Sequence, residues 1–267
     1  MYKDEKGYQQ LLLDVLNTGI ARPDRTGTGA TSVFGRQITF EDVENHFPLF
    51  TSRKIFTKGV IGELCGFLRG AMSTQELAEF GCNYWSAWAF DRKEENLGPI
   101  YGAQWRSFNG AGVDQITDLI KNLKSDPCSR RHLVSCWNPQ ELDDMALPPC
   151  FDSFQVYVGN DDTLHMIVRM RSSDLVIGLP SDVLFHALLL KLIAQEVGLH
   201  AGDLTFQLGD AHIYNNHLEQ ARLVATRKLY PPCTATIDDV LTVEVEPGDI
   251  TIENYQHNDP VHLELSL

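Results

Sequence analysis

The amino-acid sequence predicts a single α+β domain built around one mixed sheet. Helical and strand patterns intermix along the chain without the regular strand-helix-strand period of a parallel α/β fold. With 267 residues, of which 43% are hydrophobic, the chain can bury one large core. No low-complexity linker or internal repeat interrupts it, so we assign residues 1–267 to one domain.

Three helices are expected in the first half of the chain. The first covers residues 7–17 and precedes a Gly- and Thr-rich stretch, 21–32, which we interpret as an irregular loop. Apolar residues at helical spacing predict the second helix over 59–70, which ends at a glycine. The third is amphipathic, covers 113–127 and is closed by a proline.

Strands dominate the second half. Alternating apolar residues predict strands over 154–158 and 163–172, joined by a GNDD turn. The stretch 184–198 is apolar nearly all round and is expected to be a buried helix. A further strand is expected in 131–137, and 241–255 is expected to form two more.

The charge balance and the cysteine spacing narrow the functional class. With 36 acidic against 22 basic residues, the net charge of -14 disfavours broad contact with nucleic acid or anionic membrane. The six cysteines form no C-x-x-C pair and no zinc spacing, which indicates a reducing compartment and no metal site. The N-terminus lacks a signal-peptide pattern, and no apolar run approaches the roughly 20 residues that span a bilayer. We expect a cytoplasmic protein.

Cys150 stands between a Pro148-Pro149 pair and the strand that follows. A cysteine at a strand start is usually a small buried hydrophobic residue, and this interpretation stays open. The two prolines stiffen the approach to the thiol, as a fixed nucleophile requires. A working thiolate also needs positive charge nearby.

Four arginines lie in short polar motifs of this acidic chain: DRTGTG (Arg25), CSRRH (Arg130 and Arg131) and MRSSD (Arg171). Each is equally compatible with an exposed surface position. Together they indicate a bound dianion such as a phosphate, because guanidinium forks match its oxygens.

Three acidic residues admit a structural and a functional interpretation. Glu63, on an apolar helix face, is either a satisfied buried carboxylate or a proton-transfer group with a raised pKa. Asp182 follows Ser181, a fair N-cap, and would complement the helix dipole in a first turn. Asp174 lies at a strand end and is equally compatible with a turn.

Aromatic and histidine motifs are similarly ambiguous. His212 and Tyr214, in GDAHIYNNH, could be turn or helix-start residues as well as ligand-binding residues. Trp85 and Trp88, in YWSAWAF, are more typical of a core than of a stacking platform for a flat ligand.

Taken together, the motifs resemble the thymidylate synthase family, in order and along nearly the whole chain. The matching blocks are DRTGTG, FPLFTSRK, the glutamate of GEL-x-x-FLRG, YWSAWA, GPIYGAQWR, DQI, SRRH-x-VS-x-WN, ALPPC, RSSD, GLP and GDAHIYNNH. The resemblance implies a mixed sheet with surrounding helices, an obligate homodimer and 5,10-methylenetetrahydrofolate as the one-carbon donor.

The resemblance also assigns roles by position. Cys150 would attack C6 of a pyrimidine nucleotide, which makes C5 nucleophilic, Glu63 would organise proton transfer, and Tyr101 would assist loss of the C5 proton. The resemblance further implies that Arg25, Arg171 and Ser172 bind the 5'-phosphate, joined by Arg130 and Arg131 from the partner subunit. His212 and Tyr214 would bind the sugar 3'-hydroxyl. Asp174 would bind the pterin, and Trp85 and Trp88 would line the folate site.

Three positions depart from the family pattern. Members of the family bind the uracil edge with an asparagine, whereas this chain has Asp182 at that position. The residue after the nucleophile is usually histidine in the family and is Phe151 here. The residue before RS is usually glutamine in the family and is Met170 here. Cytosine presents an amine donor and a bare N3, which a carboxyl group sharing one proton can match. We therefore expect dCMP as the substrate. Phage deoxycytidylate hydroxymethylases of this fold share the aspartate and the MRS-x-D pattern, so a phage-encoded enzyme and an enzyme of a modified-nucleoside pathway both stay open.

The outcome after one-carbon transfer is less constrained. This chain has Gly66 where the family usually has a tryptophan, and its tail ends LELSL. Both features would loosen the closure of the active site that excludes water. Since addition of water gives the hydroxymethyl group, we expect 5-hydroxymethyl-dCMP as the product. The alternatives are a dCMP C5-methyltransferase that forms dihydrofolate, a thymidylate synthase acting on dUMP, and a non-catalytic nucleotide-binding homologue.

Overall fold

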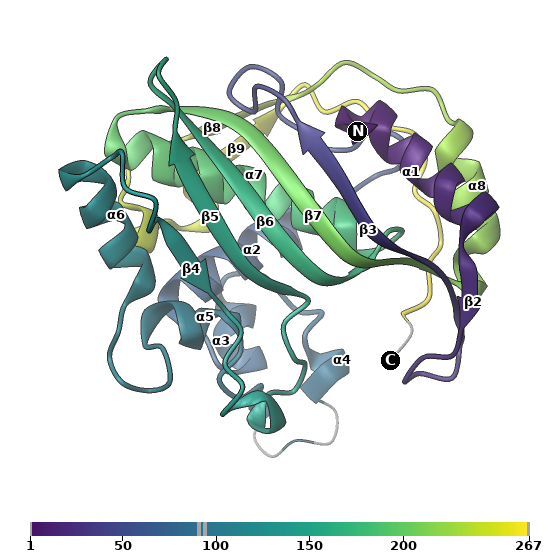
Figure 1. The fold of residues 1–267 in the computed structure, drawn as a ribbon, viewed down its shortest axis with the longest axis horizontal. Coiled ribbons are helices and arrows are strands. Elements are labelled where there is room, and N and C mark those ends of the chain that lie inside the picture. Colours follow the sequence, from purple (N-terminus) through teal and green to yellow (C-terminus); the bar gives the residue numbers. More distant parts are fainter. Residues whose placement is uncertain (1, 90–91, 93–94, 266–267) are drawn as a thin grey trace.

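The computed structural model describes residues 2–89, 92 and 95–265. Within them one mixed sheet organises the chain, with strand order β1-β3-β7-β6-β5-β4 and β2 paired to β3 (Figure 1). β1 with β3 and β6 with β7 run parallel, whereas the other pairs in this sheet are antiparallel. The strands are β1 Tyr2–Lys3, β2 Ile20–Arg22, β3 Ala30–Phe40, β4 Leu133–Ser135, β5 Phe151–Val158, β6 Thr163–Asp174 and β7 His200–Tyr214, with a separate hairpin of β8 Thr234–Ile237 and β9 Ile250–Glu253.

Helices cover one face of this sheet (Figure 1). The apolar α7 lies against β6 and β7, and α2 packs against α7, so both are buried in the core. The helices are α1 Asp4–Thr18, α2 Thr57–Arg69, α3 Thr74–Glu79, α4 Ser86–Ala89, α5 Tyr101–Arg106, α6 Gln115–Ser125, α7 Gly178–Val197 and α8 Leu218–Thr226, with 3-10 turns η2 Leu142–Asp144, η3 Asn215–His217, η4 Thr242–Glu244 and η5 Pro247–Asp249.

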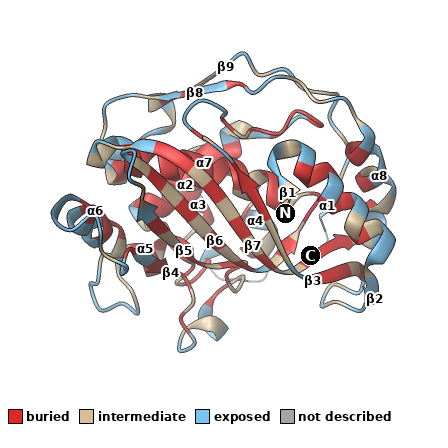
Figure 2. Cartoon of the chain, turned by 45° about the horizontal axis from the view of Figure 1, so that its top comes forward, coloured by how far each residue is buried: buried red, intermediate tan, exposed pale blue. Residues whose placement is uncertain are grey.

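Side-chain alternation along the strands explains the two unlike faces of the sheet. In β6, Leu164, Met166 and Val168 are buried, while Ile167 and Arg169 point to the other face and are half-buried. Figure 2 shows this striping of buried and intermediate residues along β5, β6 and β7. In the part of the chain that the structure describes, no helix lies over the second face in Figure 1.

Most of the predicted elements are confirmed, with longer bounds for α1, β5, β6 and α7. The glycines that end α2 and α7, Gly70 and Gly198, have φ values of 83° and 76°, the left-handed conformation that glycine adopts most readily. The predicted α+β class with a mixed sheet is therefore correct. None of the described helices has the length and apolar character needed to cross a membrane.

Three local predictions are wrong. The stretch 241–255 contains two 3-10 turns and one strand, β9, because its proline and glycine interrupt the alternation. Both ends of the predicted loop 21–32 belong to strands, because β2 extends to Arg22 and β3 begins at Ala30. Asp182 is not a first-turn residue, because α7 begins four residues earlier at Gly178.

Candidate active site

The Pro148-Pro149 turn delivers Cys150 to the point where β5 and β6 begin to pair. The backbone N–H of Arg171 donates to the Cys150 carbonyl at 2.8 Å, and the Arg171 Nε donates to the Pro149 carbonyl at 3.1 Å. Phe151, the first residue of β5, pairs with Met170. The strand start predicted for Cys150 is confirmed, and its backbone is fixed from both sides.

Tyr101 supports the thiol from α5. The Cys150 backbone N–H donates to the Tyr101 hydroxyl oxygen at 2.7 Å, which leaves the phenolic hydrogen free to point at sulfur. Burial and then the Asp182 carboxylate raise the pKa of the half-buried Cys150 thiol to about 11, opposed by Arg171 and Tyr101. In this state the thiol is protonated at neutral pH, so a nucleophilic role requires proton loss after ligands bind.

Two carboxyl groups on different helices act in sequence: Asp182 acts on the thiol, and Glu63 acts on Asp182. Glu63, in the middle of α2, accepts a 2.6 Å hydrogen bond from the Trp85 indole N–H. Burial raises the Glu63 pKa to about 7, although hydrogen bonding from Trp85 and Tyr84 opposes the rise. For Asp182, on α7, burial and then the charges of Glu63 and Asp174 raise the pKa well above its ordinary value. The charge of Glu63 therefore disfavours ionisation of Asp182.

Among the described residues, the backbone carbonyl of Asp182 is hydrogen-bonded to His186, but its carboxyl group has no hydrogen-bond partner. One of its oxygens, Oδ2, lies 3.7 Å from the position that a Cβ would take on Gly178. A half-buried carboxyl group without a protein partner is available to a ligand.

The ends of β6 and β7 bring the predicted sugar-binding and folate-binding residues together. Asp174 and His212 are paired in register, and the charge of Asp174 contributes to raising the Tyr214 pKa after burial. Burial alone would lower the pKa of His212, but the carboxylates of Asp210 and Asp174 outweigh it and raise the pKa. Ser172 lies beside them, in register with Asp210.

The four arginines separate into two groups. Arg171 is exposed, with its guanidinium carbon 5.6 Å from the centre of the Trp137 ring, and Arg25 acts electrostatically on Tyr214. Arg130 and Arg131 are exposed between α6 and β4. Within the residues the structure describes, the Arg130 and Arg131 guanidinium groups make no hydrogen bond or ion pair, and nothing places them at Cys150 of their own chain.

The two tryptophans differ in burial. Trp85 packs edge-on against Phe67 and Tyr101 in the core, which confirms a structural position, and its ring centre lies 5.4 Å from that of the half-exposed Trp88. Trp88 is thus the more accessible of the two rings.

His186 was missed by the sequence interpretation. It lies one turn after Asp182 on α7, its Nδ1 is 2.8 Å from the Asp182 carbonyl, and its ring meets Phe151 edge-on at 4.6 Å. Burial lowers the His186 pKa to about 4, so the ring is neutral at pH 7. The i,i+4 spacing from Asp182 was the available signal.

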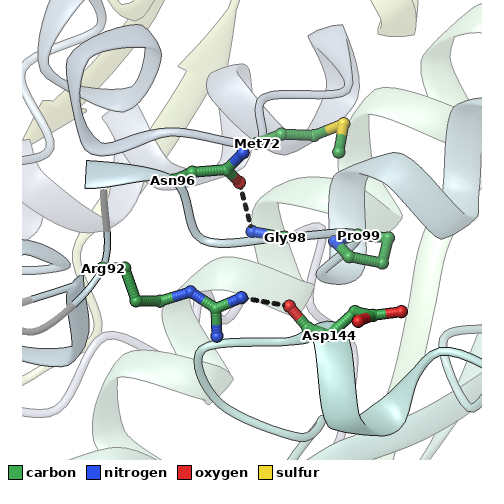
Figure 3. Close-up of a pocket in the computed structure, with 6 residues that line it drawn as sticks. All are labelled: Met72, Arg92, Asn96, Gly98, Pro99 and Asp144. Atoms are coloured by element: carbon green, nitrogen blue, oxygen red, sulfur yellow. Dashed lines mark hydrogen bonds between the residues drawn. The ribbon is translucent and has the colours of Figure 1, made fainter. Parts of the chain in front are cut away.

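An open pocket of about 550 Å³ is lined by Met72, Arg92, Asn96, Gly98, Pro99 and Asp144 (Figure 3). The Arg92 guanidinium donates to the Asp144 carbonyl there, and the Gly98 N–H donates to the Asn96 side-chain oxygen at 2.6 Å. None of the predicted site residues lines this pocket. The described residues also contain no cluster of three or more His, Cys, Asp or Glu side chains arranged for a metal ion.

A thiol fixed beside a phenol, an Asp182 carboxyl group that acts on that thiol, and a Glu63 carboxyl group that acts on Asp182 are typical of enzymes that work by nucleophilic addition with proton transfer. The family model for thymidylate synthase matches residues 6–267, and the chain belongs to that family. Membership defines the reaction at one level: a one-carbon unit is transferred from a folate to a pyrimidine nucleotide.

Proposed function

We propose that the protein transfers a one-carbon unit from 5,10-methylenetetrahydrofolate to C5 of dCMP and releases 5-hydroxymethyl-dCMP. The observation that carries the choice of base is the Asp182 carboxyl group, which has a raised pKa and no hydrogen-bond partner among the described residues. Its proton can be donated to the bare N3 of cytosine while the other oxygen accepts from the exocyclic amine. A cytosine ring can also retain that proton on N3, whereas uracil already carries a hydrogen there.

The same geometry supports roles for the neighbouring groups. Cys150 is the nucleophile toward C6, and a proton shared between Asp182 and N3 makes C6 more electrophilic. Tyr101 holds the Cys150 backbone at 2.7 Å and is placed to assist proton removal at C5. Arg25, Arg171 and Ser172 are proposed to bind the 5'-phosphate, and His212 with Tyr214 the sugar.

The donor set fits a folate. The Asp174 Oδ1 accepts from the Val176 N–H at 2.9 Å, and its second oxygen has no hydrogen-bond partner in the described residues, so it can accept from a pterin N–H group. Trp88, half-exposed beside Trp85, offers a ring face to a flat pterin. When bound, methylenetetrahydrofolate supplies the carbon at the formaldehyde oxidation level.

The release of a hydroxymethyl product requires that water be added, and the structure bears on this in two ways. Glu63, with a pKa of about 7, can accept a proton from water near neutral pH. The expected loosening at Gly66 is not supported, since Leu77 of α3 fills that space, 2.6 Å from where a Cβ would lie. The last two residues of the LELSL tail lie outside the described residues. The close packing at Gly66 keeps the C5-methyltransferase as the second candidate.

The direct test is mass spectrometry of the nucleotide after incubation with methylenetetrahydrofolate and either dCMP or dUMP, with dihydrofolate measured in the same samples. We expect 5-hydroxymethyl-dCMP without dihydrofolate. Formation of methyl-dCMP with dihydrofolate would support the second candidate, and product from dUMP alone would contradict the role given to Asp182.

Asp182→Asn is expected to shift the preference toward dUMP. An amide donates to O4 and accepts from the N3 hydrogen of uracil, but it cannot share a proton with cytosine. We expect the ratio of kcat/KM for dCMP over dUMP to fall by roughly 100-fold. Asp118→Asn, on the exposed side of α6, is the matched control and leaves the ratio unchanged. An unchanged ratio of kcat/KM for dCMP over dUMP in Asp182→Asn would refute the proposal that Asp182 recognises the cytosine ring.

We further propose a homodimer in which Arg130 and Arg131 reach the phosphate site of the partner subunit. Their exposed guanidinium groups and the uncovered sheet face of β5 to β7 support this arrangement (Figure 1). Mixing inactive Arg130→Ala/Arg131→Ala chains with inactive Cys150→Ala chains is expected to restore about a quarter of the wild-type activity, since half of the dimers then carry one intact site. No recovery after verified subunit exchange would exclude shared sites.

A further inference from the structure

Tyr84 lies against the face of α2 that carries Glu63. Gly59 and Glu63 are four residues apart and share this face. A Cβ on Gly59 would lie 3.0 Å from the Tyr84 ring, and one on Gly62 would lie 2.3 Å from the Phe80 carbonyl oxygen. The two glycines therefore let the segment before α4 pack directly on α2, with the Tyr84 ring one turn from the carboxyl group.

Two neighbouring residues of this segment act on the carboxyl group. The Trp85 indole N–H donates to Glu63 Oε1 at 2.6 Å. The Tyr84 hydroxyl lowers the pKa of the same carboxyl group, the effect of a nearby hydrogen-bond donor. The other titratable groups acting on this set, in the described chain, are Cys82 beside Tyr84 and Asp182 on α7. No cation is among them, so hydrogen bonds are the means by which the protein stabilises ionised Glu63.

The two donors differ in chemistry. An indole N–H can only donate, whereas a phenol can donate to a carboxylate and accept from a carboxylic acid. We propose that Tyr84 is a positioning residue that holds the Glu63 carboxyl group, together with Trp85, through both of its protonation states. This inference rests on the proposed function only for the part that Glu63 plays in the reaction.

The first test requires no substrate. Glu63 is titrated by carbon NMR of protein labelled at the glutamate carboxyl carbons, with Glu63→Gln used to assign the signal. In Tyr84→Phe one donor to the carboxylate is lost, so we expect the Glu63 pKa to rise by roughly one unit. Tyr2→Phe is the matched control, because it removes a tyrosine hydroxyl that donates to another carboxylate, Asp14, at 2.8 Å. It leaves the Glu63 titration unchanged.

The second test is the pH dependence of kcat/KM, measured with whichever nucleotide the wild type turns over. We expect the limb that reports Glu63 to move by the same amount in Tyr84→Phe, with the thermal midpoint kept near that of the wild type. An unmoved Glu63 titration in a folded Tyr84→Phe protein would overturn the inference. A moved titration in a protein that turns over only dUMP would retain the inference and refute the dCMP proposal instead.

Discussion

Replacing Cys150 by serine is expected to lower kcat/KM by at least about 10⁴-fold, because a serine hydroxyl cannot replace a thiolate as the nucleophile toward C6. The backbone contacts that hold the residue, from Arg171 and to Tyr101, do not involve the sulfur and are kept. Nucleotide binding should therefore change little. Steady-state kinetics together with calorimetric binding of dCMP separates the two effects.

Cys128→Ser is the matched control, since Cys128 is an exposed thiol between α6 and β4 and should be dispensable. The raised pKa adds a second measurement. With a Cys150 pKa of about 11, its alkylation by iodoacetamide should be slow at pH 7 and accelerate about tenfold per pH unit. Substantial activity in Cys150→Ser would refute the role of Cys150 as the nucleophile, as would alkylation of Cys150 that does not affect turnover.

Local sequence signals predicted the parts of the site that depend on local structure. The Pro148-Pro149 pair and the alternation after it place Cys150 at a strand start, and the apolar spacing around Glu63 places it inside a helix. Asp174 was predicted at a strand end and is the last residue of β6. In each case the determining interactions lie within a few residues of the side chain.

The misplaced features depend on tertiary contacts. Ser181 looks like an N-cap for Asp182, but burial of Leu179 and Pro180 in the core extends α7 back to Gly178. The Tyr84 ring packs where Gly59 lacks a side chain, a relation between residues 25 positions apart that no local pattern contains. The length of β3 and β7 likewise follows from their antiparallel pairing.

Glu63→Gln is expected to lower activity and raise stability together. Loss of a general acid-base group costs roughly 10² to 10⁴ in rate. Stability changes in the opposite direction, because the folded-state pKa of about 7 lies above the ordinary value of 4.5. Below 4.5 the carboxyl group is protonated in both states, and as the pH rises through 7 the wild type loses the stability that the protonated form supplied.

The shift from 4.5 to about 7 corresponds to about 3 kcal/mol at pH 8, at 1.36 kcal/mol per unit. Urea unfolding of both proteins between pH 4.5 and 8, at one fixed protein concentration, measures the difference, which should grow with pH in favour of Glu63→Gln. Glu219→Gln, at a side chain that is 90% exposed, is the control and gives no such trend. Parallel curves for wild type and Glu63→Gln would mean that Glu63 is not held in a destabilised state. A widening gap with lost activity would show that the fold gives up stability to keep a carboxyl group ready to exchange protons near neutral pH.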